Sequence, residues 1–183
     1  LRDGDKLVGV DITSGNNDIM LFSANGKSIR FKEADVRAVG RTAIGVRGMK
    51  LVDDEIVSAI VADDSSPILT ATEKGYGKRT GLDEYRAQAR GGSGVISIKT
   101  SDRNGKVVGA IQVTDEDEMM LISNKGTLVR ARAADVSIIG RNTQGVTLIN
   151  ISKGEKLVSV AKIAETEGEE SDDNTETDAE VEG

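Results

Sequence analysis

The segment Leu7-Val8-Gly9-Val10 organises the chain, because three close copies of it follow at nearly equal distances. The copies are Ile56-Val57-Ser58-Ala59, Val107-Val108-Gly109-Ala110 and Leu157-Val158-Ser159-Val160, at offsets of 49, 51 and 50 residues. Glycines recur at similar offsets, as Gly26, Gly75 and Gly126 and again as Gly45, Gly94 and Gly145. A period of about 50 residues indicates a repeat architecture, with three complete repeats and the first strand of a fourth.

Each repeat has the pattern of four short strands. In the first repeat we expect strands at 6–13, 18–23, 27–32 and 45–51, with a hairpin turn at Asn25-Gly26. Four strands in a period of this length favour a propeller-like array, in which neighbouring repeats bury one another's faces. The predicted fold is therefore all-β, with blades over residues 1–164 that start near 6, 55, 106 and 156. Its predicted core includes Ile12, Leu21, Val46 and their equivalents.

The composition excludes several classes of site. The 183 residues include no Cys and no His, so thiolate metal sites and imidazole general bases are absent. Only two Tyr and two Phe are present, which argues against a base-stacking platform for single strands. No apolar run approaches a membrane span. We expect a cytoplasmic protein, of which this chain, beginning at Leu1, is a C-terminal part.

Charge is divided unevenly along the chain. Residues 165–183 carry ten carboxylates and no basic residue, which leaves 24 basic against 21 acidic residues over 1–164. Such a tail cannot bury enough apolar surface to offset its ordering entropy, so we expect it to be disordered. We also expect it to lie against the basic body and compete with anionic partners, so that its deletion would raise affinity for them at low salt. A tail kept for solubility is the alternative.

Basic residues recur at two positions in the repeats. Arg30, Arg79 and Arg130 share a place in the third strand, where alternation predicts that Arg30 and Lys32 point outward and their apolar neighbours inward. Arg41, Arg90 and Arg141 share a place in the glycine-flanked loop before the fourth strand. Such a loop can bring backbone N–H groups and a guanidinium to an anion. An ordinary solvated strand face and a plain turn are the alternatives.

The stretches Gly75–Thr80, Gly94–Lys99 and Gly140–Val146 resemble the C-terminal domain of the DNA gyrase A protein. The resemblance covers essentially all of residues 1–164. That family's box, Gln-Arg-Arg-Gly-Gly-Lys-Gly, is matched at Gln88, Arg90, Gly91, Gly92 and Gly94 and departs at Ala89 and Ser93. This departure indicates a degenerate copy of the box in a late blade, with the complete box upstream of this chain.

The resemblance implies a β-pinwheel, usually of six blades that exchange strands, whose basic rim binds and wraps duplex DNA regardless of sequence. It implies as partners the rest of the gyrase A protein and the gyrase B protein, in a complex of two copies of each. ATP hydrolysis would belong to gyrase B, and the cleaving tyrosine with its Mg²⁺ to absent parts of the enzyme. This chain would hold no cofactor and no catalytic residue. The predicted DNA-binding residues are Arg30, Lys32, Arg41, Lys78, Arg79, Arg90, Gly91, Gly92, Arg130, Arg132 and Arg141.

Two other interpretations stay open at this point. The corresponding domain of topoisomerase IV is similar, and an upstream box would distinguish it. A protein-binding propeller could use the same arginines on acidic partners, and filter binding of duplex DNA at two salt concentrations would separate it from a DNA-binding domain. Tyr76 and Tyr85 are expected to pack structurally. The run Asp115-Glu116-Asp117-Glu118 is expected to form a turn and not a metal site.

Overall fold

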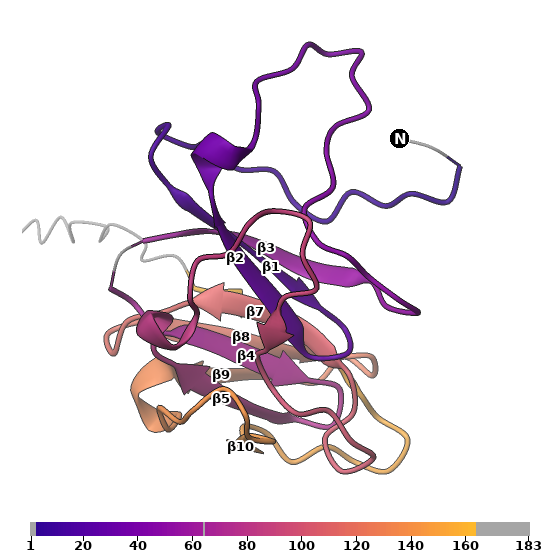
Figure 1. The fold of residues 1–183 in the computed structure, drawn as a ribbon. Helices are drawn as coiled ribbons and strands as arrows, with labels where there is room; N and C mark the ends of the chain where they lie inside the picture. The colour runs from indigo at the N-terminus through magenta and orange to yellow at the C-terminus, as the bar shows by residue number, and fades with distance from the viewer. Residues whose placement is uncertain (1–2, 64, 164–183) are drawn as a thin grey trace, which may run out of the picture.

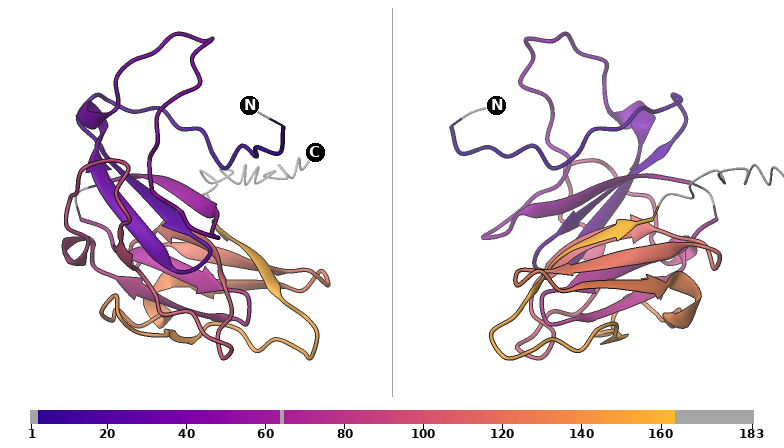
Figure 2. Two further views of the ribbon diagram at one scale, coloured as in Figure 1. Left: turned by 45° about the vertical axis from the view of Figure 1, so that its right-hand side comes forward. Right: turned by 180° about the vertical axis from the view of Figure 1, so that it is seen from behind.

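The computed structural model describes residues 3–63 and 65–163, which form three antiparallel β-sheets that follow one another along the chain (Figures 1 and 2). The first sheet has the order β3 (Ile56–Ala62), β1 (Asp18–Ser23), β2 (Lys27–Lys32) and β6 (Val95–Ile96). The second has the order β10 (Val146–Thr147), β5 (Tyr76–Thr80), β4 (Ile68–Thr72) and β7 (Val107–Gln112). The third has the order β11 (Leu157–Lys162), β8 (Glu118–Ser123) and β9 (Leu128–Arg132).

Every sheet combines strands of two successive repeats. The hairpin β1–β2 of the first repeat is flanked by β3 and β6, which are the first and fourth strands of the second repeat. The hairpin β4–β5 is flanked in the same way by β7 and β10 of the third repeat. This exchange of strands confirms the predicted all-β pinwheel. A repeat is therefore a unit of sequence, while a blade is shared between two repeats.

The cores lie between the sheets. Leu69 of β4 packs with Met119 and Leu121 of β8 in a buried cluster that joins the second and third sheets. Phe22 of β1 packs with Ile68 of β4 in a cluster that joins the first and second sheets. These clusters are aliphatic for the most part, as expected for a chain with so few aromatic residues. They fix the blades against one another and so determine where the loops between strands lie.

Two predicted strands of the first repeat, 6–13 and 45–51, are not strands in the structure. The exchange explains this difference, because these segments correspond to β3 and β6 and would flank the hairpin of a preceding repeat, which the described residues do not contain. The core prediction fails there too, since Ile12 is 92% exposed and Val46 is 37% exposed. Leu21 packs beside the small cluster of Ile29, Phe31 and Met49, as predicted.

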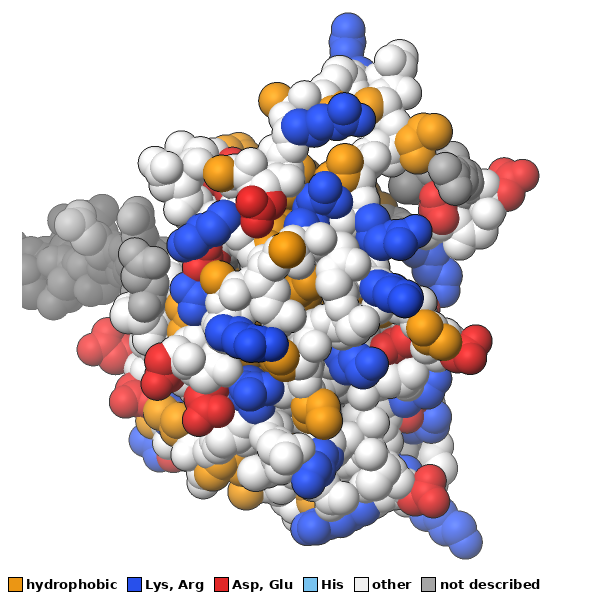
Figure 3. All heavy atoms as spheres, in the orientation of Figure 1, with side chains coloured by type: hydrophobic (Ala, Val, Ile, Leu, Met, Phe, Trp, Pro, Cys, Tyr) orange, Lys and Arg blue, Asp and Glu red, His pale blue; other side chains and the backbone are white. Residues whose placement is uncertain are grey.

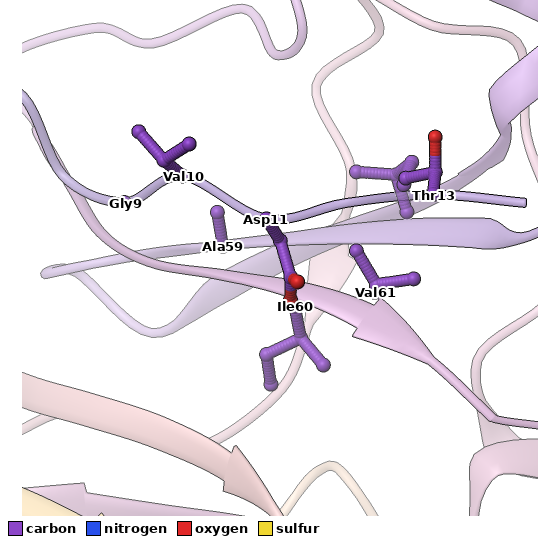
Figure 4. A pocket seen from close by; sticks show the side chains of 8 residues that line it. Gly9, Val10, Asp11, Thr13, Ala59, Ile60 and Val61 are labelled. Carbon is purple, nitrogen blue, oxygen red and sulfur yellow. The ribbon is translucent and has the colours of Figure 1, made fainter.

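Residues 9–13 instead run past β3 and leave a pocket of about 220 Å³ (Figure 4). Val10 and Thr13 line it on one side, and Ala59 and Val61 of β3 on the other. The second strand of each hairpin leads into a single 3₁₀ turn: η1 (Glu33–Asp35), η2 (Leu82–Glu84) and η3 (Ala133–Asp135). Among the described residues, no helix has the length and apolar character needed to cross a bilayer.

Candidate nucleic-acid interface

The third-strand arginines of the first two repeats do not form the predicted outward row. The side chain of Arg30 is only 17% exposed and forms an ion pair with Asp18. It donates hydrogen bonds to the carbonyl oxygens of Leu82 at 3.1 Å and Tyr85 at 3.3 Å, in the loop of the next repeat. Burial alone would raise the pKa of Asp18, but hydrogen bonds from Lys32 and Arg30 outweigh it and hold that pKa below its usual value. Arg30 therefore links two repeats.

Arg79 has the same linking role one repeat later. Its side chain is 5% exposed, pairs with Asp115, and donates to the carbonyl oxygen of Val136 at 2.8 Å. Arg30 pairs with Asp18, which lies twelve residues before it, whereas the residue twelve positions before Arg79 is Pro67. Arg79 therefore pairs with a carboxylate of the following repeat instead. The outward row is wrong for Arg30 and Arg79 because the loop of the next repeat covers them.

Lys78 is fully buried, contrary to the prediction that it faces DNA. Its ammonium group donates to the carbonyl oxygens of Gly140 at 2.7 Å and Arg141 at 3.0 Å, and to the hydroxyl of Thr80 at 3.0 Å. Desolvation by burial lowers the pKa of Lys78 to about 8. Lys78 therefore holds the loop of the third repeat in place and offers no charge to solvent.

The remaining third-strand cations are exposed but neutralised. The side chain of Lys32 is 59% exposed and shares Asp18 with Arg30. Arg130 is 64% exposed and pairs with Glu118, and Arg132 is 69% exposed and pairs with Asp135 through two hydrogen bonds. An outward position is therefore correct for these three residues, although each already has a carboxylate partner.

The loop arginines show why one residue recurs in every repeat. Arg90 is half-buried and donates to the carbonyl oxygens of Arg47 and Asp35. Arg141 donates to the carbonyl oxygen of Ile96 at 2.8 Å, and Ile96 is the equivalent of Arg47 one repeat later. Each of these arginines thus fastens the fourth segment of the preceding repeat.

Arg41 occupies the same position in the first repeat, where no preceding segment is described, and its side chain is exposed. The three loop arginines do not all face solvent alike: only Arg41 is free to do so fully, while Arg90 and Arg141 use part of their donors within the protein.

The glycines of this loop serve close backbone contacts. Gly145 has φ +82°, and a Cβ there would lie 2.6 Å from the carbonyl oxygen of Gly77. Gly91 has φ +82° and donates its N–H to the carbonyl oxygen of Gly48 at 2.7 Å, while the carbonyl of Gly92 accepts from the N–H of Lys50 at 2.8 Å. Neighbouring backbone thus occupies the N–H of Gly91 and the carbonyl of Gly92. The phosphate contact predicted for these two glycines therefore cannot use the N–H of Gly91.

Beside the three predicted loop arginines lie five exposed cations that sequence reasoning missed. The segments 36–51, 85–99 and 136–151, which follow the 3₁₀ turns, contain no acidic residue. Their basic residues define what we call the basic strip: Arg37, Arg41, Arg47, Lys50, Arg86, Arg90, Lys99 and Arg141. The signal for them in the sequence is the absence of carboxylates from three equivalent segments.

Backbone contacts make the basic strip continuous across the three repeats. Residues 48–50 lie beside residues 91–92, through the contacts just described. The next junction is similar, because the N–H of Lys99 donates to the carbonyl oxygen of Thr143 at 2.8 Å. Figure 3 shows Lys and Arg side chains from the top to the bottom of one face, with most Asp and Glu side chains toward its two sides. The strip thus combines the predicted loop arginines Arg41, Arg90 and Arg141 with five cations that were not predicted.

Six members of the basic strip are exposed and form no ion pair with any residue in the described part of the chain. They are Arg37, Arg41, Arg47, Lys50, Arg86 and Lys99. An unpaired, solvated cation can bind a phosphate without first breaking an internal ion pair. These six side chains are therefore the most available anion contacts of the strip.

Other predicted features have simple structural roles. The hydroxyl of Tyr85, which is buried, hydrogen-bonds to Ser97 at 3.0 Å, and Tyr76 packs under the guanidinium of Arg103. Asp115 pairs with Arg79, and Asp117 pairs with Lys162 at 2.8 Å. No group of three or more carboxylates within the described ranges is arranged to hold a metal ion. The predicted disordered tail, 165–183, lies outside the described residues.

Comparison with known proteins identifies relatives over most of the chain. The family model described as "DNA gyrase C-terminal domain, beta-propeller" matches three times, at residues 17–63, 66–114 and 117–164. The DNA gyrase A protein of Salmonella typhimurium is 56% identical over 166 residues, which are 90% of this chain and 19% of that protein. The Escherichia coli gyrase A protein is 54% identical over 171 residues, or 93% and 20%. The chain thus spans about a fifth of the length of these relatives.

Two solved structures share the fold. A DNA gyrase A C-terminal domain superposes with a TM-score of 0.76 at 32% identity, covering 81% of this chain and 51% of that one. The C-terminal domain of DNA topoisomerase IV superposes with a TM-score of 0.84 at 28% identity, covering 89% and 51%. The backbone alone therefore does not separate the two enzymes, and the relatives named above at 54–56% identity are gyrase A proteins. The chain belongs to the DNA gyrase C-terminal domain family of β-propellers.

Proposed function

We propose that this chain binds duplex DNA along the basic strip and, as part of a DNA gyrase A protein, bends the duplex around the blades. The observation that supports this most is the row of six exposed cations without ion pairs on segments that contain no acidic residue. Lysine and arginine contacts to phosphates do not depend on base sequence, and no element of the described residues has the form of a recognition helix.

The proposed binding has a predictable dependence on salt. Six phosphate contacts would release counterions with a slope of about −5 in log affinity against log salt concentration. Affinity would then fall by about a thousandfold between about 50 and about 200 mM salt. Smooth bending of a duplex site of 20–30 bp costs roughly 1–6 kcal/mol of free energy. A contact with one cation is insufficient to offset this cost, so a row of cations spread over neighbouring blades is needed.

The test is filter binding of a duplex of about 30 bp to the full chain at those two salt concentrations. A double variant, Arg47→Gln with Lys50→Gln, should reduce the slope by about 2 and weaken binding at low salt. The backbone contacts of both residues remain in this variant. The matched control is Lys125→Gln with Lys153→Gln, which removes the same charge from exposed positions outside the strip.

The control pair should leave affinity and slope unchanged within error. Equal losses in the two double variants would show that only net charge matters and would overturn the assignment to the strip. Failure to retain duplex at about 50 mM salt would refute the DNA-binding function and favour a protein-binding propeller.

For the whole protein, we propose a part in ATP-dependent negative supercoiling by a type II topoisomerase, in a complex of two gyrase A and two gyrase B proteins. The family membership supports this assignment, as does the bacterial origin of the relatives named above. Strand cleavage, Mg²⁺ and ATP hydrolysis are assigned to other parts of that complex. A cytoplasmic, chromosome-associated location follows from the same proposal. Sedimentation of the full complex on DNA with and without this domain would test the association.

A further inference from the structure

The three repeats contribute very unequally to the basic strip. Segment 36–51 carries four basic residues, 85–99 carries three, and 136–151 carries only Arg141. The three segments are equivalent in sequence position, so the decline reflects which residues each copy carries. A duplex that follows the strip therefore meets a declining number of cations from the first repeat to the third.

Ion pairing strengthens this decline. Of the described arginines, one of four is ion-paired in the first repeat (6–54), one of four in the second (55–105) and all three in the third (106–155). In the first two repeats the paired arginine is the buried one of the third strand. In the third repeat, the exposed arginines of β9 are paired as well. The third repeat thus offers phosphates no arginine that is free of a carboxylate.

Glu84 accounts for the loss of the one strip cation in the third repeat. This residue lies on η2 of the second repeat, and its carboxylate is 3.7 Å from Nε of Arg141. That nitrogen is buried and makes no hydrogen bond with any described group. Arg90, the equivalent of Arg141, contacts carbonyl oxygens and forms no ion pair with a described residue. The same arginine position therefore lacks a carboxylate partner on the second repeat and has one on the third.

We propose that the strip has a direction: duplex DNA is held on the first and second repeats and leaves the surface at the third, where Glu84 withholds Arg141 from the phosphates. This inference rests on the DNA-binding function proposed above. It names Glu84 as a residue that sets the extent of the contact, and it assigns the third repeat the weakest hold on the duplex.

The cysteine-free chain allows a direct test by tethered cleavage. Ile44, Ser93 and Gln144 are equivalent loop positions, one in each repeat, whose side chains make no hydrogen bond to a described residue. Ile44→Cys, Ser93→Cys and Gln144→Cys would each carry an iron chelate that cleaves nearby DNA through hydroxyl radicals. With a bound duplex, we expect strong cleavage from positions 44 and 93 and several-fold weaker cleavage from position 144.

A second variant tests the role of Glu84. Glu84→Gln, combined with the chelate at position 144, should raise cleavage several-fold toward the level seen from position 93. Asp83→Asn is the matched control, because it removes the same charge from the adjacent exposed residue, which has no ion pair with Arg141. The control should leave cleavage from position 144 low.

The outcomes separate this inference from the function on which it rests. Equal cleavage from all three positions, or the strongest cleavage from position 144, would overturn the direction while leaving DNA binding intact. An unchanged pattern in Glu84→Gln would overturn the role of Glu84. No retention of duplex by the unlabelled chain would refute the DNA-binding function itself, and with it this proposal.

Discussion

At the two junctions between repeats, equivalent side chains of β2 and β5 are buried by different chemistry. At the first junction, Ile29 and Phe31 of β2 are buried in an apolar cluster on either side of Arg30. At the second, Lys78 and Thr80 of β5 occupy the same two positions, and both donate to carbonyl oxygens of residues 139–141. Only the central arginine is common to both. A repeated backbone can therefore be stabilised by packing in one copy and by buried hydrogen bonds in the next.

The largest effect should come from the apolar junction. Phe31→Ala removes a side chain that is 3% exposed, and we expect a loss of about 3 to 5 kcal/mol in the free energy of unfolding. Thr80→Ala at the other junction removes one hydroxyl that donates to the carbonyl oxygen of Ile139 at 2.9 Å, and should cost about 1 to 2 kcal/mol. Urea denaturation measures both, and equal losses would contradict the distinction between the junctions.

The polar junction should be sensitive to pH through Lys78. Its pKa of about 8 in the folded protein lies below the usual value of 10.5, so the unfolded chain binds more protons between these pH values. The stability of the wild type should therefore rise with pH over this window, by at most about 3 kcal/mol relative to Lys78→Met.

Denaturation of both proteins near pH 7 and near pH 10 gives this difference, and groups common to both cancel. If the difference in the free energy of unfolding between the wild type and Lys78→Met were the same at both pH values, burial would not lower the pKa of Lys78.

The polar junction also depends on a glycine, whereas the glycine of the β8–β9 hairpin makes no such contact. Gly145→Ala places a Cβ 2.6 Å from the carbonyl oxygen of Gly77 at φ +82°, and should cost about 2 to 3 kcal/mol. Gly126 has φ +84° but no atom within 4 Å of its added Cβ, so Gly126→Ala should cost only about 1 kcal/mol. Thermal unfolding compares the two, and a larger loss of stability at Gly126 would mean that backbone conformation matters more than the contact between repeats.

The smallest effects concern the loop arginines. Arg90→Ala breaks hydrogen bonds to the carbonyl oxygens of Arg47 and Asp35 and should lower stability by about 1 kcal/mol. Arg41→Ala removes an exposed side chain, so the free energy of unfolding should change by less than about 0.5 kcal/mol. The slope of log DNA affinity against log salt concentration should decrease in magnitude by about 1. Equal destabilisation by both variants would show that Arg41 has a structural partner after all.

The sequence was sufficient to predict where the hairpins lie. It was not sufficient to predict which residues their side chains contact. Alternation and the Asn25-Gly26 turn located β1 and β2, because both signals lie in the residues of the hairpin itself. The exposure of Arg30 and Arg79 depends on a loop that lies about fifty residues further along, and periodicity carries no information on that contact. The same limit explains the segments 6–13 and 45–51, whose strand character depends on a neighbouring hairpin and not on their own residues.

Recurrence of a residue was also ambiguous. An arginine in every repeat fits a shared ligand, but it fits equally a contact that every repeat makes with the next, as Arg90 and Arg141 do. Lys78 could have been identified as different, because its equivalents are Ile29 and Val129 and a lysine among apolar residues is out of pattern. The basic strip could have been found by asking where carboxylates are missing.

The exchange of strands also constrains how the protein folds during synthesis. Lys27 pairs with Ile96, so the hairpin β1–β2 leaves the ribosome well before the strand that covers its edge. Until then the edge is open to pairing with other chains. A nascent chain from which only the first repeat has emerged would be a risk for aggregation, whereas one from which β6 has emerged can complete its first sheet. Translation pauses should therefore be tolerated best once Ile96 has left the ribosome.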